Sequence, residues 1–465
     1  MTNNRFFSVH GHFYQPPRED PFTGKIPREA GAEPYHDYNE KITAECYYPN
    51  ALLGNFERIS FNLGPTLAAW LAAHAQETYK RIIQSDHAHL NAYGVGNAIA
   101  QSAHHTILPL TRRRDKIAQV AWGIASYEYR FGHKPTGMWL PETAVDYETL
   151  EALSAAGLSF TILSDEQVYG DLRQGAGPYR VRLSGGRSIA VFVRDRFLSN
   201  QISFDMEQFS GPRAWAHQAL FSREPGLVLL ATDGETFGHH HRGGEQFLQY
   251  LVLRDVPALG FQVTSLAAHF ASHPPQSEIE IHEVTSWSCA HGVARWATGC
   301  DCTPGDSRWK GALRRALDNL ASEIDLVYTG EVCASGISAW PLRDAYIAIV
   351  LGQIDEPAFL STHGLSHLPT AAADRIMKLL RAEFHRQRMY TSCAFFFEEL
   401  TRSEPRYAIA NAARAIALVK EATGEDLARG FRRDLSVAIS SRVGVTGADL
   451  YDATVASAQV NGHIK

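Results

Sequence analysis

The feature that most constrains the fold of this chain is an alternation of short apolar runs with longer amphipathic stretches before residue 285. Strands separated by helices are typical of a parallel sheet covered by helices, and nearly continuous apolar strands fit burial on both faces. The number of repeats favours an α/β barrel over an open sheet. The predicted strands lie at residues 6–12, 88–94, 136–140, 160–164, 189–194 and 227–232, and the predicted helices at residues 65–85, 113–130, 146–156 and 243–254.

The hydrophobic pattern changes after residue 285, and strand patterns become rare beyond it. Amphipathic helices are predicted at residues 308–328, 342–353, 371–389 and 408–423. A length of 465 residues also exceeds the roughly 250 residues of one ordinary barrel. We therefore predict a (β/α) barrel over residues 1–285 and a mainly helical domain over residues 286–465.

Composition narrows the class of protein. A net charge of -6, without a basic stripe, argues against a nucleic-acid partner. No apolar stretch approaches the roughly 20 residues of a membrane helix, and the N-terminal residues lack the pattern of a signal peptide. Six sparse cysteines fit a reducing compartment. We expect a cytoplasmic protein with no membrane partner; its oligomeric state is not predicted.

Charged side chains follow several predicted strands directly. Glu142 follows the strand at residues 136–140, and Asp233 follows the strand at residues 227–232. In α/β barrels the active site lies at the carboxyl ends of the strands, so these two carboxylates are expected to face one pocket. Glycoside hydrolysis uses such a pair, one as nucleophile or base and the other as proton donor.

Simpler interpretations remain open for the same residues. Glu142 is equally compatible with a position beside a helix N-cap, and Asp233 with a plain Asp-Gly turn. His10 and His12 point to the same side of a strand, as a metal pair, a sugar-binding pair or two hydrogen-bonded core histidines would. The three histidines at residues 239–241 are also compatible with a solvated loop.

Five segments in order carry a resemblance to a known family. They are His12-Phe13-Tyr14-Gln15-Pro16, residues 96–110 ending in His105-Thr106-Ile107-Leu108-Pro109-Leu110, Gly137-Met138-Trp139-Leu140-Pro141-Glu142, Asp233-Gly234-Glu235-Thr236-Phe237-Gly238, and residues 286–296 with Trp287, His291 and Trp296. Together they resemble the motifs of glycoside hydrolase family 57, and more closely a subgroup with a cysteine-containing C-terminal region. The spacing from His12 to Gln15 is longer than in the shortest form of the family motif.

The resemblance implies an incomplete (β/α)7 barrel followed by a helical C-terminal domain that contributes to the substrate cleft. It implies a retaining hydrolase or transglycosylase acting on α-glucans through a covalent glycosyl-enzyme intermediate, with no cofactor and no catalytic metal. Glu142 matches the family's nucleophile and Asp233 its general acid/base. Retention predicts that the two carboxyl groups lie roughly 5–5.5 Å apart.

Further residues are predicted to bind substrate: His10, His12, Gln15, His105, Trp139, Arg194, Asp195, Glu235, His239, Trp287, His291 and Trp296. Arg194 is expected to favour the ionised form of Glu142. The pKa of Asp233 has to be raised for it to act as an acid. For the three tryptophans a plain core role is an open alternative to stacking on sugar rings.

Cys289, His291, Cys300 and Cys302 are residue types that bind zinc. Their spacing contains no CxxC pair, and the family motif assigns His291 to substrate. We therefore predict no metal site, while the sequence leaves a metal on the cysteines open.

Two other functions compete with a glycosidase. A metal-dependent barrel hydrolase of the amidohydrolase or deacetylase type would use His10 and His12 as its opening metal pair, with Asp233 and His239 as further ligands. A glucan-binding homologue would keep the barrel fold but would have lost catalytic turnover. The sequence does not distinguish hydrolysis from transfer or branching, because that choice depends on how loops exclude water from the acceptor site.

Overall fold

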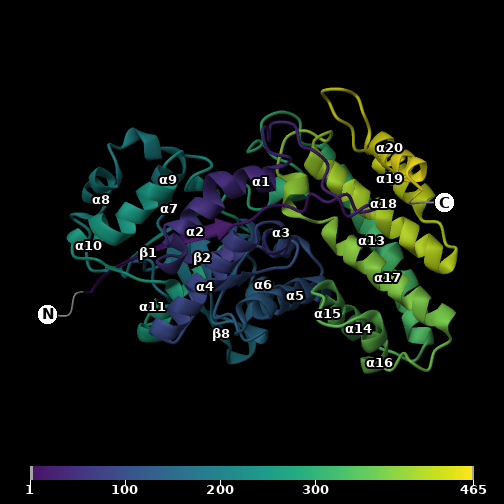
Figure 1. Ribbon diagram of the computed structural model, residues 1–465, viewed down its shortest axis with the longest axis horizontal. Coiled ribbons are helices and arrows are strands. Elements are labelled where there is room, and N and C mark those ends of the chain that lie inside the picture. Colours follow the sequence, from purple (N-terminus) through teal and green to yellow (C-terminus); the bar gives the residue numbers. More distant parts are fainter. Residues whose placement is uncertain (1–3, 463–465) are drawn as a thin grey trace. The chain divides into compact units, whose positions relative to one another are not determined.

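The computed structural model describes residues 4–462 (Figure 1). The first three residues of the predicted barrel and the last three of the predicted helical domain, 1–3 and 463–465, lie outside the described residues. The chain forms two compact units. The first comprises Met1–Pro17, Arg28–Ala103 and Gln119–Ser288, and the second comprises Arg18–Pro27, His104–Ala118 and Cys289–Lys465. Each unit is described by itself below.

The first unit is built on seven parallel strands that follow one another round a barrel. Parallel ladders join β9, β1, β2, β3 and β4, and another joins β5 to β8. A bridge between Gly137 and Phe160 links β4 to β5. The Asp195 N–H donates to the Leu229 carbonyl between β8 and β9 (2.9 Å). The strands are β1 (Arg5–Phe13), β2 (Ser60–Leu63), β3 (Ala98–Gln101), β4 (Met138–Trp139), β5 (Phe160–Ser164), β8 (Ser188–Arg194) and β9 (Gly226–Asp233).

Short strands and helices complete this unit. Strand β10 (Gln262–Val263) pairs with β1, β7 (Tyr179–Arg182) runs antiparallel to β8, and β6 (Val168–Gly170) pairs with β11 (Ile279–Ile281). Figure 1 shows the helices outside the strands. They include α1 (Tyr38–Ile42), α2 (Tyr48–Leu52), α3 (Pro65–His74), α4 (Gln76–Tyr93), α6 (Tyr147–Ala155), α7 (Arg196–Phe204), α8 (Pro212–Leu220), α9 (Gly244–Tyr250), α10 (Val256–Ala258) and α11 (Leu266–Ser272). Helix α5 (Arg113–Phe131) begins in the second unit and ends in the first.

The barrel core is apolar, as the strand composition predicts. Side chains such as Ile99, Phe160, Phe192 and Leu229 are fully buried in one cluster. Burying a side chain of this size stabilises the fold by roughly 1.5–3 kcal/mol. The polar residues at the strand ends therefore rest on a rigid apolar base.

One predicted strand is wrong. Residues 88–93 form the end of α4, and the residue that follows the helix, Gly94, has a φ of 75°. Glycine adopts this left-handed conformation without a steric penalty and terminates helices for that reason. The helix predicted over residues 65–85 is interrupted at Ala75, between α3 and α4. The prediction also missed β2 and β3, which are only four residues long each.

The second unit is helical. Its long helices α13 (Trp309–Ala334), α17 (Thr370–Arg388) and α18 (Ser403–Thr423) lie side by side (Figure 1). Their facing sides bury apolar residues such as Leu317 and Leu380. Shorter helices are α12 (Ala294–Ala297), α14 (Ala339–Ala345), α15 (Ile347–Val350), α16 (Glu356–Thr362), α19 (Ala428–Leu435) and α20 (Gly447–Val460). The predicted fold class, a (β/α)7 barrel followed by a helical C-terminal region, is confirmed.

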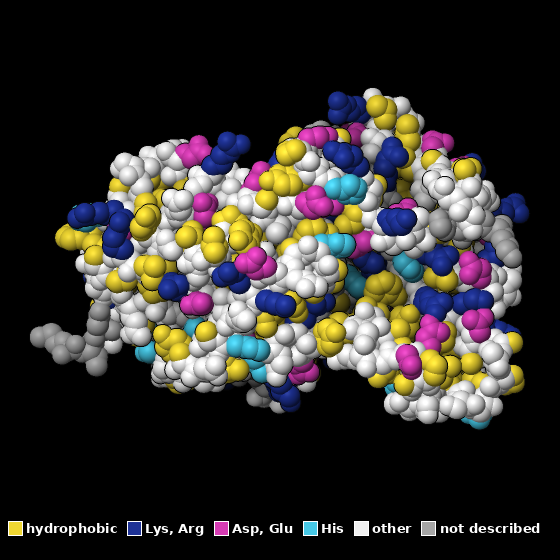
Figure 2. Space-filling view, viewed as in Figure 1, with side chains coloured by type: hydrophobic (Ala, Val, Ile, Leu, Met, Phe, Trp, Pro, Cys, Tyr) yellow, Lys and Arg dark blue, Asp and Glu magenta, His cyan; other side chains and the backbone are white. Residues whose placement is uncertain are grey.

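Basic and acidic side chains are interspersed on the face drawn in Figure 2. This mixed distribution agrees with the modest net charge of -6. Of the helices that the structure describes, none combines the length and the apolar character needed to cross a bilayer.

Candidate active site

Glu142 lies in a strained turn directly after β4. The turn covers Pro141–Thr143, and the backbone is left-handed at Glu142 (φ 57°) and at Thr143 (φ 49°). Such angles cost of order 1–3 kcal/mol for a residue other than glycine and persist only where neighbours hold them. Gln167 does so: its Oε1 accepts from the Thr143 hydroxyl (2.7 Å) and its Nε2 donates to the Thr143 carbonyl (2.9 Å). The strain thus indicates a functional constraint on Glu142.

The Glu142 side chain is oriented by the segment at residues 287–288. Its Oε2 accepts hydrogen bonds from the Trp287 indole N–H (3.1 Å) and from the Ser288 hydroxyl (2.7 Å). The Trp287 backbone N–H also donates to the Glu142 carbonyl (3.1 Å). Hydrogen bonds to a carboxylate are stronger than those to a neutral group, so this arrangement orients Glu142 as an anion.

Asp233 is the last residue of β9 and pairs in register with His12 of β1. A side chain at the next residue, Gly234, would approach the Phe13 ring within 2.3 Å, so glycine is required here by the closeness of β1. Asp233 is exposed to solvent, although protein atoms surround its carboxyl group closely. Burial first, and then the charges of Glu235 and Glu142, raise the pKa of Asp233 to about 8, although Arg194 acts in the opposite direction.

Glu235 lies two residues further on and is buried. Its Oε1 accepts from the Tyr47 hydroxyl (2.5 Å), the Tyr14 N–H (3.3 Å) and the Gln15 amide (3.5 Å). Burial raises the pKa of Glu235 to about 7, and these hydrogen bonds limit the shift. The Glu235 carboxyl group therefore acts on Asp233 in addition to Glu142 and favours the protonated form of Asp233.

His10 and His12 are both engaged by the Asn62 side chain. The Asn62 Oδ1 lies 3.1 Å from His10 Nε2 and 3.2 Å from His12 Nδ1, and the other His10 nitrogen lies 3.2 Å from the Ser60 hydroxyl. Both imidazoles stack on Trp139, with ring centroids 5.1 and 4.9 Å away. Burial lowers the pKa of each histidine to about 3, so both are neutral. Both His10 nitrogens have protein partners, which disfavours this residue as a metal ligand.

Arg194, the last residue of β8, is buried beside the site. Its guanidinium lies 4.7 Å from the centre of the Trp287 ring and donates to the Ala231 carbonyl (3.1 Å). Burial lowers the pKa of Arg194 to about 10, while Glu166, Asp165 and Asp233 raise it. The guanidinium remains a cation at neutral pH and interacts with Asp233.

The remaining predicted residues are spread over both units. Asp195 caps α7 and forms an ion pair with Arg223 (2.8 Å). His239 faces Glu45 (2.6 Å) in a hollow that it shares with Lys41, Arg242 and Glu245. Trp139 and Trp296 are both fully buried, so neither presents a ring face to solvent, whereas Trp287 is partly exposed. His105, His291 and Trp296 belong to the second unit.

Several residues that shape this site were not predicted. Asn62 is the next-to-last residue of the short strand β2 and Gln101 is the last residue of β3, and the Asn62 side-chain amide donates to the Gln101 side-chain oxygen Oε1 (2.8 Å). The rule that polar residues at strand ends form the site would have found both, had these strands been recognised. Tyr47 and Gln167 each end a short helical turn, and the sequence offers no signal for either residue.

Chemically, the site combines two carboxyl groups in different environments with two histidines stacked on the buried Trp139. Glu142 is held by two donors, and Asp233 is surrounded by protein and by other carboxyl groups. Neutral imidazoles, amides and hydroxyls around them are suited to hydrogen bonding with an uncharged polyhydroxy ligand.

Two family models match this chain and together cover most of it. The family model described as "Glycosyl hydrolase family 57" matches residues 6–282, and one described as "Domain of unknown function (DUF3536)" matches residues 306–463. The chain is 33% identical over 143 residues to the 1,4-alpha-glucan branching enzyme TK1436 of Thermococcus kodakarensis, covering 24% of this chain and 21% of that protein. It is 24% identical over 241 residues to an alpha-amylase of Pyrococcus horikoshii, covering 50% of this chain and 34% of that protein.

A solved structure shows the same fold over nearly the whole chain. The exo-type maltose-forming amylase from Pyrococcus sp. ST04 superposes with a TM-score of 0.76 at 14% identity, covering 98% of this chain and 88% of that chain. By contrast, the matches to the two curated relatives span at most 34% of their length.

Proposed function

This chain belongs to glycoside hydrolase family 57, and on that premise we propose that it is a retaining glycoside hydrolase or transglycosylase acting on α-glucans, with Glu142 as nucleophile and Asp233 as general acid/base. The observation that carries the proposal is the contrast between the two carboxyl groups. A retaining mechanism needs one ionised and one protonated group at the start of the reaction. Two donors hold the Glu142 carboxyl group, as an ionised nucleophile requires, and burial and like charges raise the pKa of Asp233 to about 8, as a proton donor requires.

In this mechanism Glu142 attacks the anomeric carbon, and Asp233 gives its proton to the departing glycosidic oxygen. The bond from the anomeric carbon to that oxygen breaks as the bond to Glu142 forms. Asp233, now a carboxylate, then takes a proton from water or from an acceptor sugar hydroxyl, which displaces Glu142. Glu235 and Arg194 act on Asp233 in opposite directions and so adjust its pKa.

The α-glucan substrate is inferred from the relatives, two of which are named as an alpha-amylase and a 1,4-alpha-glucan branching enzyme. A metal-dependent hydrolase is less well supported, because His10 and His12 share Asn62 as partner and His239 faces Glu45 in another hollow. The geometry thus favours sugar hydroxyls over a metal ion at the strand ends.

The test is incubation with amylose, glycogen and short maltooligosaccharides, with reducing ends and product lengths measured for wild type, Glu142→Gln and Glu77→Gln. Glu77 is an exposed residue of α4 paired with Arg81, so its variant is a matched control. New reducing ends indicate hydrolysis, and redistributed lengths or new branches without them indicate transfer. Either activity is expected to fall by about 10⁴-fold or more in Glu142→Gln alone. Undiminished activity in that variant would refute the assignment of Glu142.

A small nucleophile tests the role of Glu142 more directly. In Glu142→Gly, azide fits the space of the lost carboxylate and attacks the anomeric carbon from the same side. The expected product is a glycosyl azide of inverted configuration, formed only with added azide. Glu77→Gly with azide is the control and is expected to give the ordinary products.

A further inference from the structure

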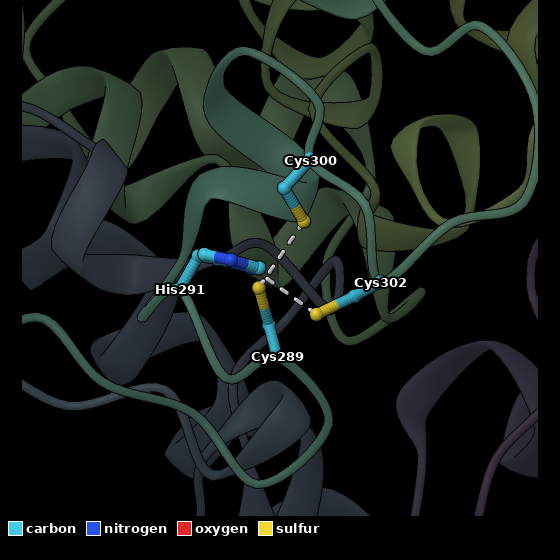
Figure 3. Close-up of side chains that lie close together, drawn as sticks. All are labelled: Cys289, His291, Cys300 and Cys302. Carbon is cyan, nitrogen blue, oxygen red and sulfur yellow. Dashed lines mark hydrogen bonds between the residues drawn. The ribbon is translucent and has the colours of Figure 1, made fainter.

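Four side chains of the second unit, from Cys289, His291, Cys300 and Cys302, lie close together. The sulfurs of Cys289 and Cys300 lie 3.5 Å apart, and His291 Nδ1 lies 3.3 Å from the Cys302 sulfur. One ligating atom from each of the four residues lies within 4.8 Å of every other. Figure 3 shows the four side chains pointing toward a common centre.

The spacing matches a tetrahedral metal site. Zinc binds thiolate sulfur at about 2.3 Å and histidine nitrogen at about 2.0–2.1 Å, which places neighbouring sulfurs of a tetrahedron about 3.8 Å apart. Three thiolates and one imidazole form a common ligand set for structural zinc. The predicted assignment of His291 to substrate is thus at odds with its position among the three sulfurs.

The ligands come from two short segments on either side of α12. Cys289 and His291 precede the helix with one residue between them, and Cys300 and Cys302 follow it in the same pattern. The regular structure described between residues 289 and 308 is this four-residue helix. Local backbone turns and the buried Trp296 hold this segment, and a bound metal would add a crosslink between its two ends.

Backbone N–H groups donate hydrogen bonds to two of the sulfurs. The backbone N–H groups of His291 and Arg295 hydrogen-bond the Cys289 sulfur, and that of Ala290 hydrogen-bonds Cys302. Such donors orient metal-bound sulfur and offset its negative charge.

Lys310 supplies an independent argument. Its side chain is fully buried, and its ammonium donates to the Thr303 hydroxyl (3.1 Å) and the Phe396 carbonyl (3.2 Å). A buried cation requires a compensating charge. Cys289 and Cys300 are among the groups whose negative charge would stabilise it. Zinc with three thiolates and a neutral imidazole carries a net charge of about -1, which Lys310 balances.

We propose that Cys289, His291, Cys300 and Cys302 bind one Zn²⁺ ion in a structural site. All four positions of the tetrahedron are filled by protein, so the ion has no open position for water or substrate. A disulfide between Cys289 and Cys300 would use two of these residues and leave His291 and Cys302 without a role.

The site adjoins the proposed nucleophile along the chain. Cys289 follows Ser288, whose hydroxyl donates to Glu142. A metal that holds Cys289 in place restrains the neighbouring residue as well. This consequence rests on the proposed function, whereas metal binding itself does not.

The test is the metal content of the full chain, purified under reducing conditions, equilibrated with Zn²⁺ and then freed of unbound metal. Wild type and Cys333→Ser are expected to retain one zinc per chain, since Cys333 is an exposed cysteine of α13 outside the cluster. Cys300→Ser and Cys302→Ser are expected to lose it. A wild-type protein without zinc, or a Cys302→Ser protein that keeps it, would overturn the proposal.

A second measurement covers the case in which the ligand variants fail to fold. The wild-type chain loaded with Co²⁺ is expected to show the intense visible absorption and the sulfur-to-cobalt charge transfer of a tetrahedral thiolate site. An octahedral cobalt spectrum would contradict the site, as would a Cys289–Cys300 disulfide found by mass spectrometry of the reductively purified protein. Both outcomes are independent of glucan activity, so failure here and failure of the proposed function are distinguishable.

Discussion

Each unit contains a cluster of charged side chains, and the pKa of an aspartate is shifted in opposite directions in the two clusters. In the helical unit, Arg386 contacts Asp115 (2.9 Å) and Asp325 (3.0 Å), and Arg343 contacts Asp115 (2.6 Å). Burial acts to raise the pKa of Asp115, but Arg386 and Arg343 lower it below its usual value. At the strand ends of the barrel, burial and like charges raise the pKa of Asp233 to about 8.

The difference shows what pairing does to a buried carboxyl group. Asp115 forms ion pairs with three arginines, Arg386, Arg343 and Arg114, which favour its anion and suit a structural role. Glu383 of the same helical unit has no hydrogen-bonded partner among the described residues, and burial raises its pKa to about 8. Burial alone therefore does not identify a functional carboxyl group. Asp233 differs from Glu383 because it is also accessible and lies at a strand end with a second, oriented carboxyl group.

The largest expected effect separates function from stability at the barrel. Asp233→Asn is expected to lower kcat on maltooligosaccharides by about 10²–10⁴-fold, because the general acid is removed. Its free energy of unfolding at pH 7 should not fall, since asparagine resembles the protonated acid. Kinetics and urea unfolding of the same preparation measure both. An aryl glycoside with a good leaving group needs less protonation, so the rate of the first step should be partly restored in this variant. A kcat within a few-fold of wild type on natural glucans would exclude Asp233 as the acid.

The same substitution in the helical unit should do the reverse. Asp115→Asn leaves Arg386 and Arg343 with less compensating charge and is expected to lower the free energy of unfolding by about 3 kcal/mol. The activity of the fraction that remains folded should be retained. Asp374→Asn is the control, since its exposed pair with Lys378 is worth about 0.5 kcal/mol or less. Equal stability of the two variants in urea would show that the Asp115 pairing is not stabilising.

The two regions should also fail at opposite ends of the pH scale. Asp233 must be protonated to act, so kcat is expected to fall about tenfold per pH unit above about pH 8. Asp115 has a pKa below its unfolded value of 3.8, so its stabilising contribution is present above about pH 4 and is lost as the pH falls below that range. Measuring kcat and the urea midpoint of unfolding over a series of pH values tests both expectations. If the residual activity of Asp233→Asn fell in the same way above about pH 8, that fall would belong to another group.

The smallest effect concerns how Glu142 is held. Trp287→Phe removes one hydrogen bond to the carboxylate, and a bond to a charged group is worth about 1.5–3 kcal/mol, so kcat/KM should fall about tenfold or somewhat more. Trp215→Phe is the matched control, because its indole N–H bonds Gln201 away from the site (3.3 Å). If both variants lose activity equally, general packing rather than the bond to Glu142 is responsible.

Much of the site could be predicted, because barrel geometry places strand-end residues at one edge. Glu142, Asp233 and Arg194 were predicted on this rule, and all three directly end or follow a barrel strand. Asn62 escaped because β2 is short and its surrounding pattern resembled helix. The cysteine cluster was underestimated for another reason: a spacing of one residue between ligands is uncommon in zinc motifs, and His291 had a competing assignment.

The sequence by itself determined the barrel, the helical C-terminal region and the family, because hydrophobic periodicity and ordered motifs are local properties of the chain. Only the tertiary structure decided how the carboxyl groups differ. Asp115 and Asp233 are the same residue type, each beside polar and charged neighbours in sequence. Their pKa values diverge because Arg386 and Arg343 pair with Asp115, whereas burial raises the pKa of Asp233 and the charges of its sequence neighbour Glu235 and of the distant Glu142 add to that shift. Burial and the contacts with distant residues arise only when the fold brings separate segments of the chain together.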